Sequence, residues 1–173
     1  MPKQRGVTLV ELLVALTVLS FMLGVGAPSF VSLVSDNRID AATTRIAASM
    51  NYARNEAVTR AAVITLSRKS GTQFTWSEGW EIYTDTDPAG NTSRVAGDTL
   101  LRDANGFGEG LEILTNEAGN NWISFRNNGM LNEAGNPVVI AICDDRGEAN
   151  GRDITINLAG RVDIVAPSND CTP

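Results

Sequence analysis

The chain has 173 residues, a net charge of −6 at neutral pH, two cysteines and no histidine. This length accommodates one domain of ordinary size in addition to a long helix. The absence of histidine, and of GxSxG and HExxH motifs, argues against most nucleophilic and acid–base enzymes, and the acidic balance disfavours nucleic acid as a partner. We therefore predict neither an enzyme nor a cofactor.

A long run without charged residues follows a short basic leader. Lys3 and Arg5 precede it, and residues 12–35 carry no charge over 24 positions. At ~1.5 Å per residue this helix is about 36 Å long, enough to cross a bilayer core of roughly 30 Å. Because basic residues stay in the cytoplasm, we expect one inner-membrane span over residues 7–35 and an exported remainder. An ordinary secretory signal, cleaved near Ala27-Pro28-Ser29, is the alternative.

The residues at the start of this run form a recognisable motif. Gly6-Val7-Thr8-Leu9-Val10-Glu11 resembles the class III signal of type IV pilins and type II secretion pseudopilins. In that family a membrane peptidase cuts after the glycine and methylates the new amino terminus. The resemblance implies that residues 1–6 are a prepilin leader, cleaved between Gly6 and Val7. Valine replaces the phenylalanine that is usual at the first mature position.

Two further positions match this family. Glu11 becomes the fifth mature residue, and Pro28 matches a proline that kinks the helix in many members of the family.

Removal of the leader leaves 12 basic and 20 acidic residues, a net charge of −8. The resemblance implies that the glutamate recruits each new subunit at the base of a filament.

The membrane environment gives Glu11 a physical reason to find a partner. A carboxylate inside the membrane costs roughly 2.5 kcal/mol or more on insertion scales, so it normally has a neutralising cation. The amine released at Val7 is four residues away, which allows an internal pair within one helix. The amine of a neighbouring subunit is a second candidate. A side chain that only extends to the membrane surface is the third interpretation.

The helix is predicted to continue beyond the membrane, from about Thr8 to Thr59 in total. Over residues 36–60 apolar side chains recur at spacings of three and four, the pattern of one buried helix face. These residues are Ile39, Thr43, Ile46, Met50, Ala53 and Ala57. On the polar side, Glu56 and Arg60 are spaced for a favourable ion pair.

The remaining residues, 61–173, are predicted to form an exported β-rich domain. Short runs rich in β-branched and aromatic residues alternate with turn signals, which is typical of antiparallel sheet. The candidate strands are residues 62–67, 72–77, 80–84, 99–103, 111–115, 122–127, 138–143, 153–158 and 161–165. We expect a two-layer arrangement, in which the apolar helix face lies on a β-sheet.

The two cysteines, Cys143 and Cys171, both lie on the exported side. An oxidising compartment favours a disulfide between them, closing a loop of 29 residues. Such a loop contributes roughly 3 to 4 kcal/mol to stability by chain entropy. A catalytic or metal site built from free thiols lacks any histidine or further cysteine to support it.

Two loops superficially resemble ligand-binding motifs. Asp85-Thr-Asp87-Pro-Ala-Gly90-Asn91 begins like a calcium loop, but alanine occupies the fifth and twelfth positions, so a hairpin turn is the better interpretation. Gly106-Phe-Gly108-Glu-Gly110 lacks the lysine and the spacing of a nucleotide-binding loop and is predicted to be a flexible connection. We predict no metal site.

Four later segments, in this order, resemble the GspH/FimT group of minor pilins and minor pseudopilins. They are Tyr52-Ala-Arg-Asn-Glu-Ala-Val58, Gly79-Trp-Glu-Ile-Tyr-Thr-Asp85, Ile123-Ser-Phe125 before Gly129, and Gly160-Arg161-Val162. The resemblance covers nearly the whole chain. It implies a pilin-like α+β fold, in which a long N-terminal helix packs on an antiparallel β-rich domain.

The resemblance implies a function in assembly. We expect a minor pilin of a type IV pilus, held in the inner membrane with its C-terminal domain in the periplasm and later incorporated into the filament. Its partners would be the prepilin peptidase and other major and minor pilin subunits. A minor pseudopilin of type II secretion is the alternative. A DNA-binding pilin is a third, although Asp163 replaces the second arginine of the Gly-Arg-x-Arg motif found in such relatives.

Overall fold

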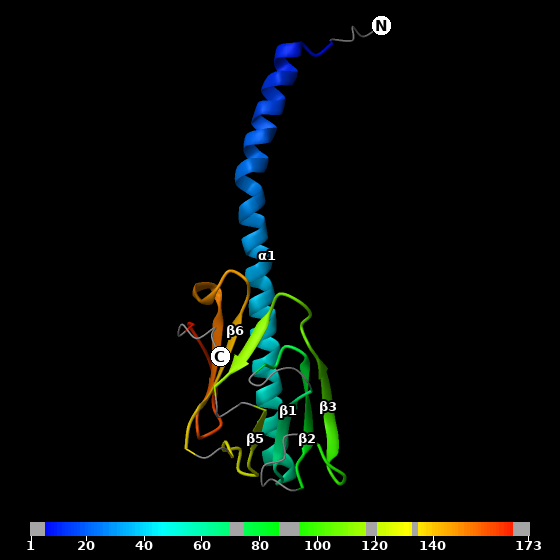
Figure 1. Cartoon of the computed structure of the whole chain (residues 1–173), viewed down its shortest axis with the longest axis vertical. Helices are drawn as coiled ribbons and strands as arrows, with labels where there is room; N and C mark the ends of the chain where they lie inside the picture. The colour runs from blue at the N-terminus through cyan, green and yellow to red at the C-terminus, as the bar shows by residue number, and fades with distance from the viewer. Residues whose placement is uncertain (1–5, 70–74, 87–93, 117–120, 133–134, 168–173) are drawn as a thin grey trace. The chain divides into compact units, whose positions relative to one another are not determined.

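The computed structural model describes residues 6–69, 75–86, 94–116, 121–132 and 135–167. One helix, α1 (Leu9–Arg60), precedes the strands, as Figure 1 shows. The predicted helix is therefore confirmed, with each end one residue later than expected. The chain divides into two compact units, residues 1–37 and 38–173, and α1 contributes to both.

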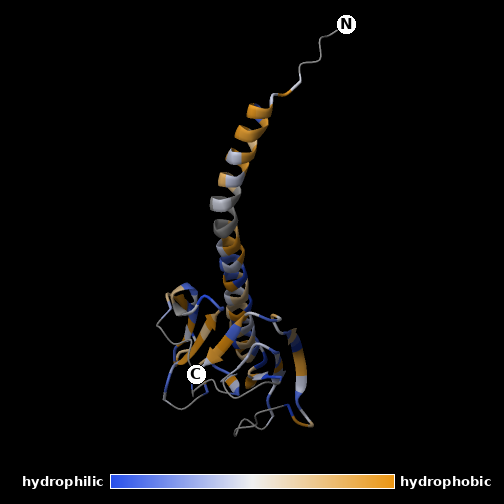
Figure 2. Cartoon of the chain, turned by 45° about the horizontal axis from the view of Figure 1, so that its top comes forward, coloured by the Kyte–Doolittle hydropathy of each residue, from blue (hydrophilic) through white to orange (hydrophobic). Residues whose placement is uncertain are grey.

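The first unit consists of the N-terminal part of α1 and the residues before it. Large apolar side chains are exposed along this segment, and Figure 2 shows that most of its described residues are hydrophobic. Hydroxyl groups inside the segment return to the helix backbone: Thr17 donates to the carbonyl of Val14, and Ser20 to that of Leu16. Among the described residues, no helix is both long enough and apolar enough to cross a bilayer.

Eight strands follow in the second unit. They are β1 (Ile64–Arg68), β2 (Gly79–Thr84), β3 (Thr99–Asn105), β4 (Glu112–Thr115), β5 (Trp122–Phe125), β6 (Val138–Cys143), β7 (Arg152–Ile156) and β8 (Val162–Val165). Each coincides with a predicted run. The remaining run, residues 72–77, lies partly outside the described residues, and its Thr75 forms an isolated bridge with Leu114.

The predicted antiparallel β-rich domain is confirmed, and its described strands form two antiparallel sheets of four. One has the order β3-β2-β1-β5 and the other the order β4-β6-β7-β8. The chain passes from one sheet to the other three times between β3 and β6. Strand pairs so far apart in sequence cannot be read from local patterns, since periodicity reports the face of a strand and not its neighbour.

The helix supplies the centre of the core. All six residues of the predicted apolar face are at most 2% exposed: Ile39, Thr43, Ile46, Met50, Ala53 and Ala57. Alternate residues of both sheets pack in the same cluster, including Ile82 and Phe125 from one sheet and Ile140 and Ile154 from the other. The amphipathic face is thus confirmed, and it joins the two sheets into one unit.

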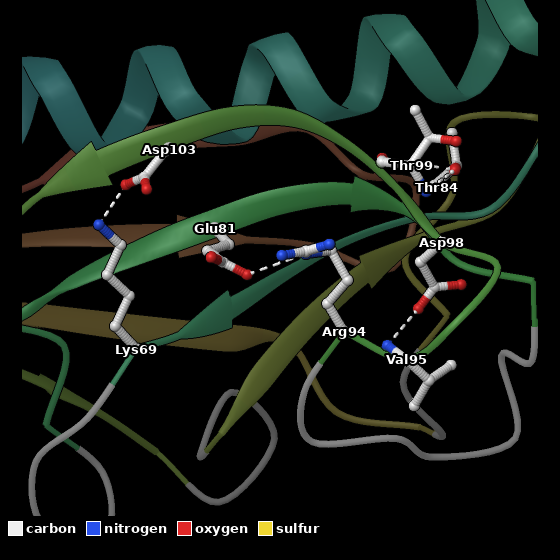
Figure 3. Close-up of polar contacts among 8 residues, drawn as sticks. All are labelled: Lys69, Glu81, Thr84, Arg94, Val95, Asp98, Thr99 and Asp103. Carbon is white, nitrogen blue, oxygen red and sulfur yellow. Dashed lines mark hydrogen bonds and ion pairs between the residues drawn. The ribbon is translucent and has the colours of Figure 1, made fainter.

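The face of the first sheet that points away from α1 carries ion pairs, which Figure 3 shows together with a hydroxyl contact between β2 and β3. Lys69 pairs with Asp103, and Arg94 pairs with Glu81 at 3.3 Å. Thr84 and Thr99 face each other across β2 and β3, where the Thr99 backbone N–H donates to the Thr84 hydroxyl at 2.9 Å. These contacts help to fix the register of β3, which is the edge strand of this sheet. Among the described residues, β3 pairs with β2 only.

The Asp98 side chain stabilises the connection between β2 and β3 through hydrogen bonds. Its carboxylate accepts hydrogen bonds from the Val95 backbone, the Thr86 backbone and the Thr86 hydroxyl, at 2.8 to 2.9 Å. Partial burial by itself raises the pKa of this carboxyl, but these hydrogen bonds and nearby Arg94 outweigh it and lower the pKa below its usual value.

We therefore expect Asp98→Asn to destabilise the protein by about 1 kcal/mol at pH 7, after allowance for solvent screening. Because the folded-state pKa is depressed, the contribution is present above the unfolded-state pKa and disappears as pH falls through the folded-state value. Urea unfolding of the full chain in detergent, followed by tryptophan fluorescence at pH 7 and pH 3, measures it. The exposed Asp145→Asn is the matched control, and an equal loss of stability at both pH values would contradict the assignment.

The end of α1 adopts a Schellman motif, with Ala61 where glycine is usual. The Ala62 N–H donates to the Ala57 carbonyl at 3.2 Å, and the Ala61 N–H donates to the Val58 carbonyl at 3.4 Å. Ala61 has a φ of 51°, in the left-handed region. A left-handed alanine costs roughly 1 to 2 kcal/mol, which glycine avoids at some entropic cost.

Ala61→Gly is accordingly expected to stabilise the domain by about 0.5 to 1 kcal/mol. The same substitution one residue later, at Ala62, should be neutral or destabilising, because φ there is not positive. Midpoints of urea unfolding for the two variants and the natural chain test this. Stabilisation by both variants would point to a general effect of glycine and not to the helix end.

Candidate assembly site

The segment that contains the predicted cleavage position lies just outside the first turn of α1. Gly6, Val7 and Thr8 are exposed and not helical, and the helix begins at Leu9. Thr8 caps it: the Thr8 hydroxyl accepts a hydrogen bond from the Glu11 backbone N–H at 3.3 Å. Threonine followed three residues later by glutamate is a capping-box sequence, so helix initiation is encoded here.

Glu11 stands in the first turn of the helix, where a negative charge interacts favourably with the helix dipole. Its side chain is exposed, and its carboxylate has no hydrogen-bond or ion-pair partner among the described residues. Val7 precedes the helix, so the spacing argument for an internal pair between its amine and Glu11 does not apply to this geometry. The carboxylate is thus available to a group from outside the chain.

Packing gives no reason for glycine at position 6. A Cβ atom added to Gly6 would have no heavy atom within 4 Å, and the residue is exposed. The peptide bond to Val7 therefore lies in an open, non-helical stretch, the kind of segment that proteases cut most readily.

The helix beyond this segment offers an extended apolar surface. Exposed large apolar side chains in the first unit are Val7, Leu9, Val10, Leu12, Leu13, Val14, Leu16, Val18, Leu19, Phe21, Met22, Phe30, Val31, Leu33 and Val34. They surround the helix and do not form one stripe, which is the pattern of a helix that is buried on all sides by other helices or by lipid. Pro28 is within the helix, but its side chain lies outside the described part, and the predicted kink stays a prediction.

At the other end of α1, Arg54 joins two loops to the helix. Its guanidinium donates to the Gly129 carbonyl at 3.0 Å and to the Ala159 carbonyl at 3.5 Å. Gly160 follows with a φ of 75°, and a Cβ atom there would be 2.0 Å from the Gly129 carbonyl oxygen. The glycine of the Gly160-Arg161 segment therefore has a packing reason of its own.

Arginines near the C-terminal end of the described chain are paired with acidic side chains. Arg161 lies 2.9 Å from Asp163, and Arg146 lies 2.9 Å from Asp144. These pairs neutralise the charge that a phosphate backbone would need. The interleaving of arginine with aspartate, visible in the sequence, thus corresponds to ion pairs in the fold.

The other residues singled out in the sequence have structural surroundings. Cys143 is buried at the end of β6 and is disulfide-bonded, while its predicted partner, Cys171, lies outside the described residues. Asp85 is buried and accepts a hydrogen bond from the Thr65 hydroxyl at 2.8 Å. Asp87, Gly90 and Asn91 lie outside the description, and the described residues contain no cluster of acidic, cysteine or histidine side chains suited to a metal.

Phe107 lies in the connection after β3 that the sequence predicts to be flexible, and it packs against the first sheet. Its ring centroid is 5.8 Å from that of Trp80, and its backbone N–H donates to the Ser77 carbonyl at 3.2 Å. Gly106 fits closely beside the same carbonyl, where a Cβ atom would be 2.1 Å away. Gly106 therefore permits close packing, whereas a Cβ atom at Gly108 would meet no heavy atom within 4 Å.

Sequence reasoning missed the Thr8 cap and the Arg54 contacts. The first had a readable signal, since the Thr-x-x-Glu spacing is local. The second had none, because the accepting carbonyls are 75 and 105 residues away along the chain.

Two protein-family models match the chain. The model described as type II transport protein GspH matches residues 42–160, and the model of the prokaryotic N-terminal methylation motif matches residues 1–27. No curated protein matches the chain by sequence.

Solved structures with the same fold come from two filament systems. The type IV minor pilin FimU of Pseudomonas aeruginosa is 25% identical with a TM-score of 0.64, over 79% of this chain and 98% of FimU. The minor pseudopilin EpsH of the Vibrio cholerae type II secretion system is 12% identical with a TM-score of 0.52, over 76% of this chain and 98% of EpsH. The second likeness shows the fold alone.

Proposed function

This chain belongs to the family of the type II transport protein GspH, and we propose that, within this family, it is a minor pilin of a type IV pilus. Members of the pilin and pseudopilin families are structural subunits and not enzymes, and they assemble with one another into filaments. The match therefore makes the chain a minor pilin or a minor pseudopilin. The choice of the pilus is our proposal.

The observation that supports the pilus is the difference between the two structural likenesses. Identity to the minor pilin FimU is 25%, against 12% for the pseudopilin EpsH, at nearly equal coverage. The TM-score is also higher for FimU, at 0.64 against 0.52. A role near the tip of the pilus, in the initiation of assembly, is part of the proposal.

We further propose how the N-terminal segment acts. The prepilin peptidase cuts between Gly6 and Val7 and methylates the new amine, which the match to the methylation motif supports. The apolar part of α1 holds the subunit in the inner membrane until assembly, with the β-rich domain in the periplasm. In the filament, Glu11 pairs with the amine of an adjacent subunit, which neutralises both charges and sets their register.

A minor pseudopilin of type II secretion is the second candidate, favoured by the description of the matching family model. A strain that lacks the chain separates the two. The pilus proposal expects loss of surface pili and twitching motility with normal protein secretion. Loss of secretion with intact pili would overturn it in favour of the pseudopilin.

A DNA-binding pilin is the third candidate. The acidic net charge and the pairing of Arg161 with Asp163 speak against it. A gel-shift assay at low salt tests the point, and retention of duplex DNA there would reopen this function.

A further inference from the structure

Three arginines lie along the border between α1 and the edge strand β3. Arg38 and Arg45 belong to the helix, and Arg102 belongs to the strand. All three are exposed. We call these residues the arginine strip, and Figure 1 shows β3 at the edge of its sheet beside the second part of α1.

Each guanidinium of the strip is held in place by an uncharged group. Arg38 donates to the Glu109 carbonyl at 2.8 Å. Arg45 donates to the Asn105 carbonyl and lies 4.7 Å from the ring centroid of Phe107. Arg102 lies 4.2 Å above the ring of Tyr52. Cation–π contacts and carbonyl hydrogen bonds orient a guanidinium without cancelling its charge.

The strip differs in this respect from five other arginines of the domain, although Arg54 and Arg126 are also held by uncharged groups. Those that pair with a carboxylate of the chain are Arg60, Arg94, Arg146, Arg152 and Arg161. No carboxylate within the described residues forms an ion pair with a member of the strip. The chain has 20 acidic residues, yet none of the described ones pairs with these three guanidinium groups, which lie in a row.

The strip is linear. One side of α1 presents, at intervals of seven residues, Arg38, Arg45 and Tyr52. The guanidinium of Arg102 lies above the ring of Tyr52. At ~1.5 Å per residue, the fourteen residues from Arg38 to Tyr52 extend over about 21 Å. A guanidinium group can donate two parallel N–H hydrogen bonds to one carboxylate, so arginine recognises carboxylates well.

We propose that the arginine strip binds carboxylates of an adjacent pilin-family subunit and thereby determines on which side of α1 that subunit packs. This inference rests on the proposed function in a filament. The strip makes one border of the exposed helix side cationic. A subunit with acidic residues facing that border therefore binds there more tightly than a subunit without them.

The charge of the strip favours a protein partner over duplex DNA. Duplex DNA carries one charge per ~1.7 Å, or about twelve over the length of the strip. Three arginines on a strongly acidic chain do not balance that charge, whereas they match a few carboxylates.

The test uses photo-crosslinking of the full chain in its own host while filaments assemble. A photoreactive amino acid replaces Leu100, two residues from Arg102, and in a second strain it replaces Val165 of β8, which is equally exposed at 40%. Adducts from sheared filaments are identified by mass spectrometry. We expect the adduct of position 100 to be a pilin-family subunit, joined at a segment that contains aspartate or glutamate.

Charge variants then test the arginines themselves. Arg38→Gln combined with Arg102→Gln should lower the adduct yield at position 100 about fivefold, as expected for the loss of two exposed ion pairs. The lysine pair at the same positions should restore most of the yield. Arg161→Gln, at an arginine that Asp163 already neutralises, should change it less than twofold.

The outcomes separate this inference from the function on which it rests. An adduct with lipid or nucleic acid, no adduct at position 100, or a yield insensitive to the double variant overturns the strip while the chain is still found in filaments. Absence of the chain from sheared filaments overturns the proposed function and the strip with it. Tryptophan fluorescence of each variant shows whether the domain is folded. If the double glutamine variant is misfolded, the double lysine variant and Arg45→Lys are compared with the single variant Arg38→Gln. The inference then requires that both lysine variants give a higher adduct yield than Arg38→Gln.

Discussion

Glu11→Ala is expected to leave cleavage after Gly6 intact and to reduce incorporation into filaments at least tenfold. Removing one partner of a buried ion pair strands the other charge in an apolar environment, which costs about 3 to 5 kcal/mol. Cleavage should persist because the backbone N–H of residue 11 still donates to the Thr8 hydroxyl, so the helix start is unchanged. Immunoblots of membranes and of sheared filaments measure the two steps separately.

Two variants sharpen this expectation for Glu11. Glu11→Gln keeps the shape but loses the charge, and it should fail like alanine if an amine of an adjacent subunit is the partner. Thr8→Val removes the side-chain acceptor of the cap and should cost about 1 kcal/mol of helix stability, with a smaller effect on incorporation. Normal filament content of the glutamine variant would show that the charge has no part in assembly.

Gly160→Ala is expected to destabilise the domain by about 3 to 5 kcal/mol, the largest effect on folding considered for this chain. Two costs combine: a left-handed φ of 75° and a Cβ atom 2.0 Å from the Gly129 carbonyl oxygen. The same oxygen accepts from Arg54, so displacement of the loop also breaks that hydrogen bond. Urea unfolding, followed by the fluorescence of the tryptophans in the second unit, measures the loss.

Gly108 provides a matched control for Gly160. It has the same φ of 75°, but a Cβ atom there would meet no heavy atom within 4 Å. Gly108→Ala should therefore cost only the conformational part, about 1 to 2 kcal/mol. Equal losses for the two variants would mean that the backbone angle, and not the contact with Gly129, requires glycine at position 160.

Local features of the structure were the ones that the sequence could predict. The periodicity of Ile39 to Ala57 identified the buried helix face, because each residue of a helix reports its own orientation. The strand positions followed from β-branched runs in the same way. The split into two sheets did not follow, because the partner of β4 is β6 and not its sequence neighbour.

The candidate site shows the same division. The leader motif located Gly6, Val7 and Glu11 from residue types alone, and the match to the methylation motif covers them. The arginine strip was not predicted, since Arg102 joins Arg38 and Arg45 only once β3 lies beside the helix. Arginine in a sequence does not reveal whether the fold supplies a carboxylate, as for Arg152 with Asp40, or an aromatic ring, as for Arg102.

The contacts of Arg54 have a consequence for the order in which the domain forms. The helix that carries this arginine is synthesised early, yet the carbonyls that it binds come 75 and 105 residues later. Closure of such long loops is slow compared with helix formation, so the apolar face around Ala53 stays uncovered until nearly the whole domain is available. While it folds, the chain therefore passes through a stage in which a formed helix exposes its core face, and a chaperone or an incorrect neighbour can bind at this stage.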